Sequence, residues 1–158
     1  MIDLGSRATV DPASSRYLRD AILSRHDVLR DLVAETVART EARELAETDL
    51  DTLRARVRRL YQTVESYLAF EERALPPALR DLIGLGALVQ EQIEEDHRKL
   101  RGDLATAQSA LEPQTLSWFE LASDLRAFAA ELLRDLDRED EALLNAQLDA
   151  LASDSQGG

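Results

Sequence analysis

Apolar residues along most of the chain recur at the three- and four-residue spacing that is typical of amphipathic helices. The first such stretch follows Asp11-Pro12, a cap with a first-turn proline, and a second stretch runs up to Pro76-Pro77, where a helix is expected to end. The apolar positions of these two stretches are Leu18, Ile22, Leu29, Val33 and Val37, and then Leu53, Val57, Leu60 and Val64.

Two further stretches complete the pattern. Gly84 and Gly86 precede the third, which extends to about Pro113, and Ser117 with Glu120 forms a capping box that opens the fourth. Their apolar positions are Val89, Ile93, Leu100 and Leu104, and then Leu121, Leu125, Phe128 and Leu132. Four helices with short connections predict an all-α, antiparallel up-down-up-down four-helix bundle.

A chain of 158 residues is long enough for one buried core, so we expect a single domain. We assign residues 12–150 to the bundle and residues 1–11 to a flexible N-terminus. We assign residues 151–158 to a disordered tail, because its last residues, Ser153 to Gly158, lack apolar anchors.

The net charge of −12 argues against nucleic acid and anionic membranes as partners, because phosphates are bound by clustered Lys and Arg. The absence of cysteine excludes disulfides and thiolate ligands, so any metal must be held by nitrogen and oxygen donors. No apolar stretch is long enough to span a membrane and the N-terminus has no apolar leader, so we expect a cytoplasmic protein. The expected oligomeric state is a monomer or a homodimer.

Each predicted helix has a seam, which is the row of apolar positions that faces the core, and polar residues occupy some of these positions. They are His26 in the first helix, Tyr67 and Glu71 in the second, His97 in the third, and Asp135 and Glu139 in the fourth. A single inward histidine or tyrosine is more often a hydrogen-bonded core residue than a ligand. Inward carboxylates need a cation, which is either a metal ion or a guanidinium such as that of Arg30, Arg73, Arg101 or Arg134. The coincidence of both histidines and three carboxylates on inward seams favours a metal site.

Turn positions place most of these side chains at one level along the bundle. A turn near residue 45 puts His26 beside Tyr67 and Glu71, and a turn between Pro77 and Gly86 brings Glu71 level with His97. A turn near residue 113 places His97 opposite about residue 129. The fourth helix must therefore be offset along the axis, or its loop irregular, for Asp135 and Glu139 to join.

In pattern and order, these residues resemble the hemerythrin-like, or HHE cation-binding, family. The matching stretches are Arg25 to Arg30, Tyr67 to Pro76, Glu95 to Arg101 and Asp135 to Leu144, and the resemblance spans about Tyr17 to Asn145. It implies a non-haem centre of two oxo- or hydroxo-bridged iron ions, with His26, Glu71, His97 and Glu139 as ligands. Tyr67 and Asp135 stand where the family usually has histidine, and both can bind iron through oxygen.

Oxygen donors in place of imidazole favour ferric over ferrous iron, whereas reversible oxygen carriage needs a stable diferrous state. The sequence therefore favours reaction with peroxide, nitric oxide or dioxygen in oxidant handling or sensing, and an oxidoreductase of the catalase, peroxidase or nitric oxide-handling kind. One alternative is a metal-free bundle that binds a basic protein partner through its acidic surface. Another is a ferritin-like oxidase, suggested by Glu94-x-x-His97, but that motif needs a second copy and the chain has none.

Overall fold

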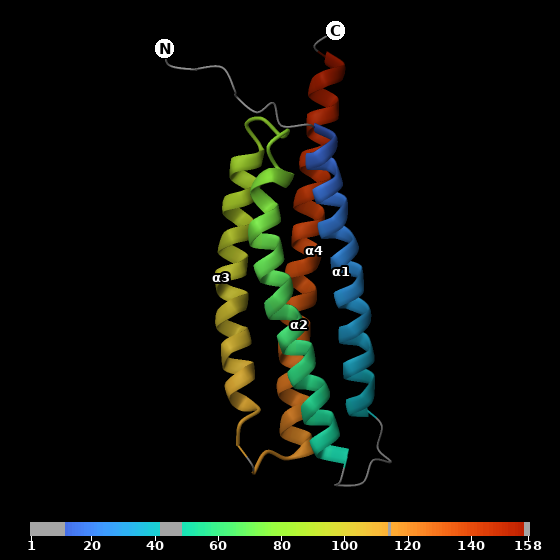
Figure 1. Cartoon of the computed structure of the whole chain (residues 1–158), viewed down its shortest axis with the longest axis vertical. Coiled ribbons are helices and arrows are strands. Elements are labelled where there is room, and N and C mark those ends of the chain that lie inside the picture. Colours follow the sequence, from blue (N-terminus) through green and yellow to red (C-terminus); the bar gives the residue numbers. More distant parts are fainter. Residues whose placement is uncertain (1–11, 42–48, 114, 157–158) are drawn as a thin grey trace, which may run out of the picture.

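The computed structural model describes residues 12–41, 49–113 and 115–156. Within this part the chain forms four α-helices: α1 (Pro12–Glu41), α2 (Asp49–Ala78), α3 (Gly86–Ala110) and α4 (Trp118–Gln156). They lie along one long axis and successive helices run in opposite directions (Figure 1). The predicted all-α four-helix bundle is therefore confirmed. None of the described helices combines the length and the hydropathy that crossing a membrane would require.

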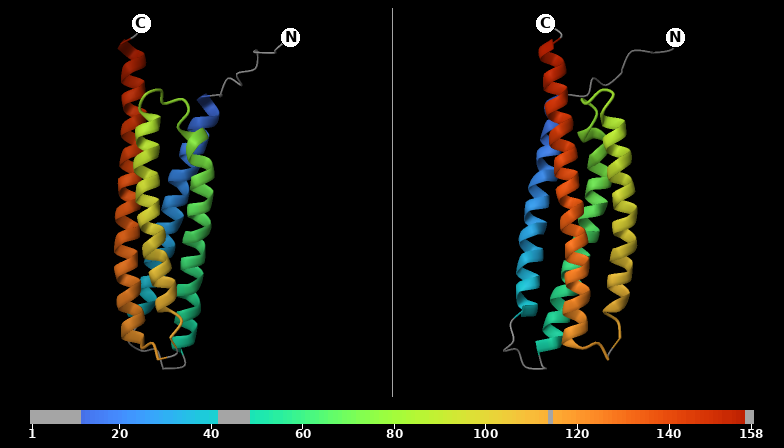
Figure 2. Two further views of the ribbon diagram at one scale, coloured as in Figure 1. Left: turned by 90° about the vertical axis from the view of Figure 1, so that its left-hand side faces the viewer. Right: turned by 180° about the vertical axis from the view of Figure 1, so that it is seen from behind.

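The predicted boundaries hold for three helices, but the fourth is longer than expected. Helix α4 continues to Gln156 and projects beyond the ends of the other helices (Figure 2). The structure continues this helix through residues 151–156, where a disordered tail was expected. The predicted flexible segment, residues 1–11, lies outside the described residues, as do residues 42–48, 114 and 157–158.

The start of α4 shows the predicted capping box. The Ser117 hydroxyl accepts a hydrogen bond from the Glu120 backbone N–H at 3.1 Å, and the Glu120 carboxylate accepts one from the Ser117 N–H at 3.1 Å. The indole of Trp118 donates to the Thr40 carbonyl at 3.2 Å, which ties the start of α4 to the end of α1. Local capping and one tertiary hydrogen bond together place this end of the helix.

The α2–α3 turn is held by side chains of α1. The Ser15 hydroxyl donates to the Pro77 carbonyl at 2.8 Å, and the buried guanidinium of Arg19 donates to the Ala78 carbonyl at 2.9 Å. These donors satisfy carbonyls at the end of α2, where the helix has no further N–H groups to offer. Gly86 is required in the turn, because a Cβ there would lie 2.6 Å from the Leu79 carbonyl oxygen.

The fourth helix is offset along the bundle axis. His97 lies thirteen residues before the end of α3, whereas Glu139 lies twenty-one residues after the start of α4, yet their side chains are in contact. The chain descends past the end of α3 before α4 begins (Figure 1). The difference of eight helical residues corresponds to about 12 Å. This offset is what brings the fourth helix into the site.

The apolar core is divided into two clusters along the axis. The larger fills the half of the bundle near the α1–α2 and α3–α4 turns, and the smaller fills the half near the α2–α3 turn. The larger cluster ends at Leu29, Leu68, Leu100 and Leu136, and the smaller begins at Ile22, Ala74, Ile93 and Leu143. On each helix, the layer between these residues contains a buried polar side chain.

Candidate metal centre

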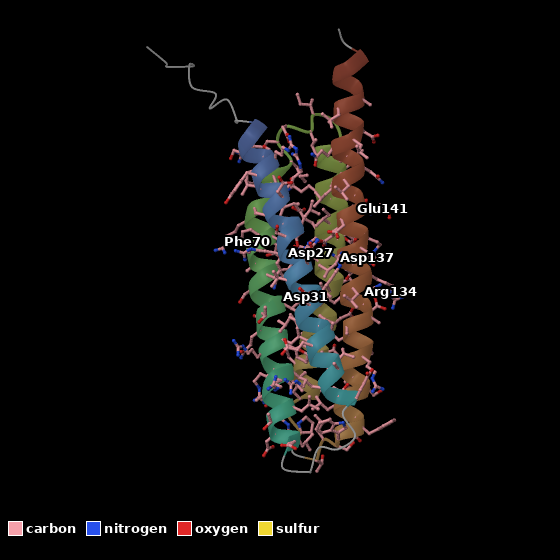
Figure 3. The ribbon with its side chains drawn as sticks, turned by 90° about the vertical axis from the view of Figure 1, so that its right-hand side faces the viewer. Asp27, Asp31, Phe70, Arg134, Asp137 and Glu141 are labelled. Carbon is pink, nitrogen blue, oxygen red and sulfur yellow. The ribbon has the colours of Figure 1, made fainter. Side chains whose placement is uncertain are left out.

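The polar layer contains one inward residue from each helix: His26, Glu71, His97 and Glu139. Their exposed fractions are 0%, 0%, 4% and 2%. Figure 3 shows the level of this layer from outside, with Asp27 of α1, Phe70 of α2 and Asp137 of α4 at the same height. The structure therefore brings together four of the six predicted site residues.

Each glutamate contacts both histidines. Glu71 lies 3.6 Å from His26 through Oε1 and 3.1 Å from His97 through Oε2, both measured to the Nε2 atom of the ring. Glu139 lies 3.2 Å from His26 Nε2 through Oε2 and 2.8 Å from His97 Nε2 through Oε1. The two carboxylates therefore span the space between the two imidazoles in the same way.

Several of these buried atoms have no hydrogen-bond partner among the described residues. They are Nε2 of His26, both carboxylate oxygens of Glu71 and Oε2 of Glu139. These atoms therefore lie close to one another without forming well-aligned hydrogen bonds. Such a group is unusual, because buried polar atoms in proteins are nearly always paired. Donor atoms of His26, Glu71 and Glu139 lie within 4.8 Å of one another, as ligands of one cation would.

Burial and charge act in opposite directions on the two histidines. Burial lowers the pKa of His26, but contacts with Asp140, Glu139 and Glu71 outweigh it and raise that pKa to about 11. The pKa of His97 is likewise lowered by burial, yet Glu139 and Glu71 raise it to about 10. Without a metal ion, imidazolium is therefore the cation that neutralises this cluster at neutral pH.

The two glutamates respond differently to the same surroundings. Burial raises the pKa of Glu71, but the two imidazoles outweigh this effect and the net shift is downward. Burial is dominant at Glu139, and repulsion from Glu71 adds to it, so the pKa of Glu139 is raised. The cluster therefore ionises Glu71 first, and Glu139 is the carboxyl that more readily holds a proton.

His26 has a second ion pair behind it. Its Nδ1 atom donates a short hydrogen bond to Oδ1 of Asp140, whose carboxylate also accepts from Nη2 of Arg30 at 2.5 Å. The pKa of Asp140 is raised by burial but lowered more by His26 and Arg30, so the carboxylate is ionised and can only accept. In a neutral imidazole this leaves Nε2 with the lone pair, directed toward the two glutamates.

Tyr67 borders the cluster. Its ring packs edge-on to His26 with centroids 5.4 Å apart, and its buried hydroxyl has no hydrogen-bond partner among the described residues. Burial raises the pKa of Tyr67, and the charges of Glu71 and Glu139 raise it further, so the side chain is a neutral phenol without metal. Its predicted role as a ligand stays a prediction.

Asp135 is bound within its own helix rather than to the other site residues. It lies one turn before Glu139 and is buried, but its carboxylate accepts a short hydrogen bond from Arg138 of the same helix. Burial raises the pKa of Asp135, and Arg138 partly opposes that shift. The offset that brings Glu139 level with His97 leaves Asp135 about 6 Å further along the axis. The structure does not place Asp135 with the four convergent residues.

Comparison with known families agrees with this geometry. The family model described as the hemerythrin HHE cation-binding domain matches residues 18–146, which is most of the chain. This chain belongs to the hemerythrin HHE family. Neither a curated protein nor a solved structure gives a match.

The hemerythrin-like bundle fits a bound cation through the residues that it contains. Two glutamates and two histidines converge with unpaired donor atoms, and among the described residues no guanidinium contacts either glutamate. Among these described residues, the groups that face the two carboxylates are therefore two imidazoles, which bind metal ions when they are neutral. The buried His/Glu cluster and the family together indicate a metal-binding bundle.

Sequence reasoning did not identify Asp140. It stands in the charged run from Asp135 to Glu141, which reads as solvated helix surface. The available signal was Arg30, four residues after His26 and hence on the same face of α1. A cation beside an expected ligand suggests an anionic partner on the neighbouring helix.

Proposed function

We propose that this chain is a non-haem di-iron protein that reacts with a small oxidant, namely peroxide, nitric oxide or dioxygen. The proposed role is oxidant handling or sensing, as an oxidoreductase, rather than reversible oxygen carriage. The observation that supports it best is that each glutamate contacts both histidines. Two carboxylates that span two imidazoles are the donor pattern of two neighbouring metal positions.

The separations agree with this assignment. Neighbouring donors on one ion are about 3 Å apart when each lies about 2.1 Å from it. The four nitrogen-to-oxygen distances are between 2.8 and 3.6 Å. His26, Glu71 and Glu139 present donor atoms close enough together to hold one ion, and His97 with the same two glutamates would hold the second.

The chemistry depends on how the chain surrounds these positions. A di-iron pair bound there would supply Lewis acidity and, from its diferrous state, the two electrons that together with two protons reduce hydrogen peroxide to two waters. Four carboxylate oxygens against two imidazole nitrogens make an oxygen-rich donor set, which favours the ferric state and disfavours reversible oxygen carriage. The apolar clusters on both sides separate the layer from the two ends of the bundle.

Loading with iron tests the proposal. Protein made metal-free and then titrated with ferrous iron under nitrogen should retain two ions per chain, counted by elemental analysis. Addition of hydrogen peroxide or nitric oxide should then change the iron spectrum. The matched control is Glu72→Gln against Glu71→Gln, because Glu72 is the next residue of α2 but pairs with Arg101 on the surface. Protein that retains no iron would rule out the di-iron function.

The same sample decides the role of Tyr67. If the phenol loses its proton to a ferric ion, a tyrosinate-to-iron charge-transfer band appears and is lost in Tyr67→Phe. If iron binds and its spectrum is the same in Tyr67→Phe, Tyr67 is only a neighbour of the site. Tyr61→Phe is the control, because Tyr61 is also a buried tyrosine of α2 but packs against Phe128 in the larger core cluster.

The metal-free alternative makes the opposite prediction. An acidic interaction module would use its net charge of −12 to bind a basic partner and would need no ion in its core. Glu71→Leu would then leave partner binding unchanged, because Glu71 is buried in the core and does not contribute to the acidic surface. Loss of bound metal and of oxidant reactivity in that variant supports the di-iron function instead.

A further inference from the structure

The two histidines of the site differ in what supports them. The Nδ1 atom of His26 is hydrogen-bonded to Asp140, whereas the Nδ1 atom of His97 is buried without a hydrogen-bond partner among the described residues. Both rings present Nε2 to the same two glutamates. The difference between them therefore lies behind the rings and not in the donor atoms that face the site.

Asp140 is itself held in place from the other side. Arg30 binds Oδ2 of Asp140 at 2.5 Å through Nη2, and the same nitrogen donates to Asp137 at 2.9 Å. The other terminal nitrogen of Arg30 donates to Asp27 at 3.1 Å. These hydrogen bonds connect His26 of α1 to Asp140 of α4 and Asp140 back to Arg30 of α1. The carboxylate of Asp140 therefore cannot rotate away from the imidazole without losing both partners.

We infer that Asp140 is a positioning residue for His26 and that, as a result, the His26 position takes up the first metal ion. A carboxylate on Nδ1 keeps the proton on that atom, aims Nε2 at the metal and increases the basicity of the ring. His97 must adopt the same tautomer and orientation without such help, so its position fills second. This inference rests on the proposed function and describes how that same site is loaded.

Metal-free protein labelled with ¹⁵N-histidine and titrated with zinc tests the inference. The Nε2 resonance of His26 should move during the first equivalent and that of His97 during the second, with the His26 proton on Nδ1 throughout. Zinc replaces iron here because it is diamagnetic, so the readout is independent of any oxidant reaction. Metal on Nδ1 of His26, or a His97 signal that moves first or together with His26, would overturn the inference.

Asp140→Asn against Asp137→Asn is the matched pair of variants. Both remove one carboxylate that contacts Arg30 and change the net charge equally, but only Asp140 contacts His26. Loss of such a partner typically weakens metal affinity about 10- to 100-fold, so Asp140→Asn should bind the first zinc ion that much more weakly. Asp137→Asn should bind as the wild type does, and Asp140→Glu should recover part of the loss.

The outcomes separate the two proposals. Equal first-ion affinity in Asp140→Asn, Asp137→Asn and wild type would overturn the positioning role while the metal site stands. Wild-type protein that takes up no zinc and no iron would end the proposed function, and the inference with it. If Asp140→Asn fails to fold, the wild-type titration and Asp140→Glu still decide the order of loading.

Discussion

The two sides of the site differ in how far the protein encloses them. On the α1–α4 side, His26 is wholly buried, and Asp140 and Arg30 lie behind it. On the α2–α3 side, His97 borders a surface hollow of about 280 Å³ whose other lining residues are Glu72, Glu94 and Arg98. The same residue type in the same cluster therefore has a closed, charged support on one side and a shallow path to solvent on the other.

This difference follows from what each helix pair places next to the site. Helix α4 contributes Asp140 directly after Glu139, so one turn of helix supplies both a ligand candidate and a support for His26. The α2–α3 pair contributes Glu72 and Glu94, which face solvent and pair with Arg101 and Gln90 instead of with His97. We expect the α1–α4 side, with Asp140 behind His26, to govern how tightly metal is retained. We expect the α2–α3 side, with the hollow beside His97, to govern how small molecules reach the site.

The largest effect is expected from removing a group that both sides share. Glu71→Gln removes the negative charge that both positions share and replaces one of its two oxygens by an amide nitrogen, so metal affinity should fall at least as far as after loss of a supporting residue, on the order of 100-fold or more. Elemental analysis after dialysis measures it. Retention of two ions per chain in this variant would contradict the bridging arrangement.

A smaller effect is expected from removing one histidine, and it should differ between the sides. His26→Ala removes the supported position, so both metal ions should be lost or bound weakly. His97→Ala should retain one ion at the His26 position, where Asp140 and both glutamates remain. Calorimetric titration with zinc gives the two stoichiometries, and equal behaviour of the variants would remove the distinction between the sides.

Metal binding should depend on pH because the two imidazoles must lose protons. The pKa values of His26 and His97, about 11 and about 10, lie above the ordinary value of 6.5. Below pH 10, metal affinity should therefore rise with pH, with up to two protons released as both positions fill. Calorimetry at pH 7.5 in buffers of different ionisation enthalpy counts these protons. Release of none would show that the metal-free histidines are already neutral.

The same shifts affect the stability of the metal-free fold in the opposite sense. A histidine whose pKa is raised by folding stabilises the folded state fully below pH 6.5, and this contribution is lost as pH rises through about 10 and 11. The urea midpoint of metal-free protein should therefore fall between pH 7 and pH 10, and that of zinc-loaded protein should fall less. The measurement is urea unfolding followed by circular dichroism.

The smallest effect is expected at the hollow beside His97. Glu94→Trp should fill part of it and slow the association of azide with iron-loaded protein several-fold, while the number of bound ions stays the same. Glu141→Trp is the control, because Glu141 is an exposed acidic residue of α4 near the level of the site (Figure 3). Stopped-flow spectroscopy follows the azide band. Equal rates in both variants would show that small molecules reach the site by another path.

Most of the fold could be predicted from the sequence because helical periodicity and end signals are local. Ser117 and Glu120 make the capping box where the pattern indicates it, and α2 ends at Ala78, one residue after Pro77. Residues 151–156, where the sequence predicted a tail, continue α4.

The candidate site could be predicted only in part. The seams indicate which side chains point inward, and His26, Glu71, His97 and Glu139 do meet. Turn positions indicated that α4 must be offset for its residues to join, but the size of the offset depends on tertiary packing rather than on periodicity. Asp135 lies on the same seam as Glu139 and was expected to join it, but its carboxylate is bound to Arg138.

The sequence by itself determined that four amphipathic helices form and that each has a polar residue on its apolar face. Both properties are encoded at separations of three and four residues, within the reach of a single helix turn. Only the tertiary structure decided that His26 is supported by Asp140 and Arg30 while His97 borders a hollow. The contacts of Asp140 with His26 and Arg30 join residues more than a hundred positions apart. They depend on the relative shift of packed helices, which no local pattern specifies.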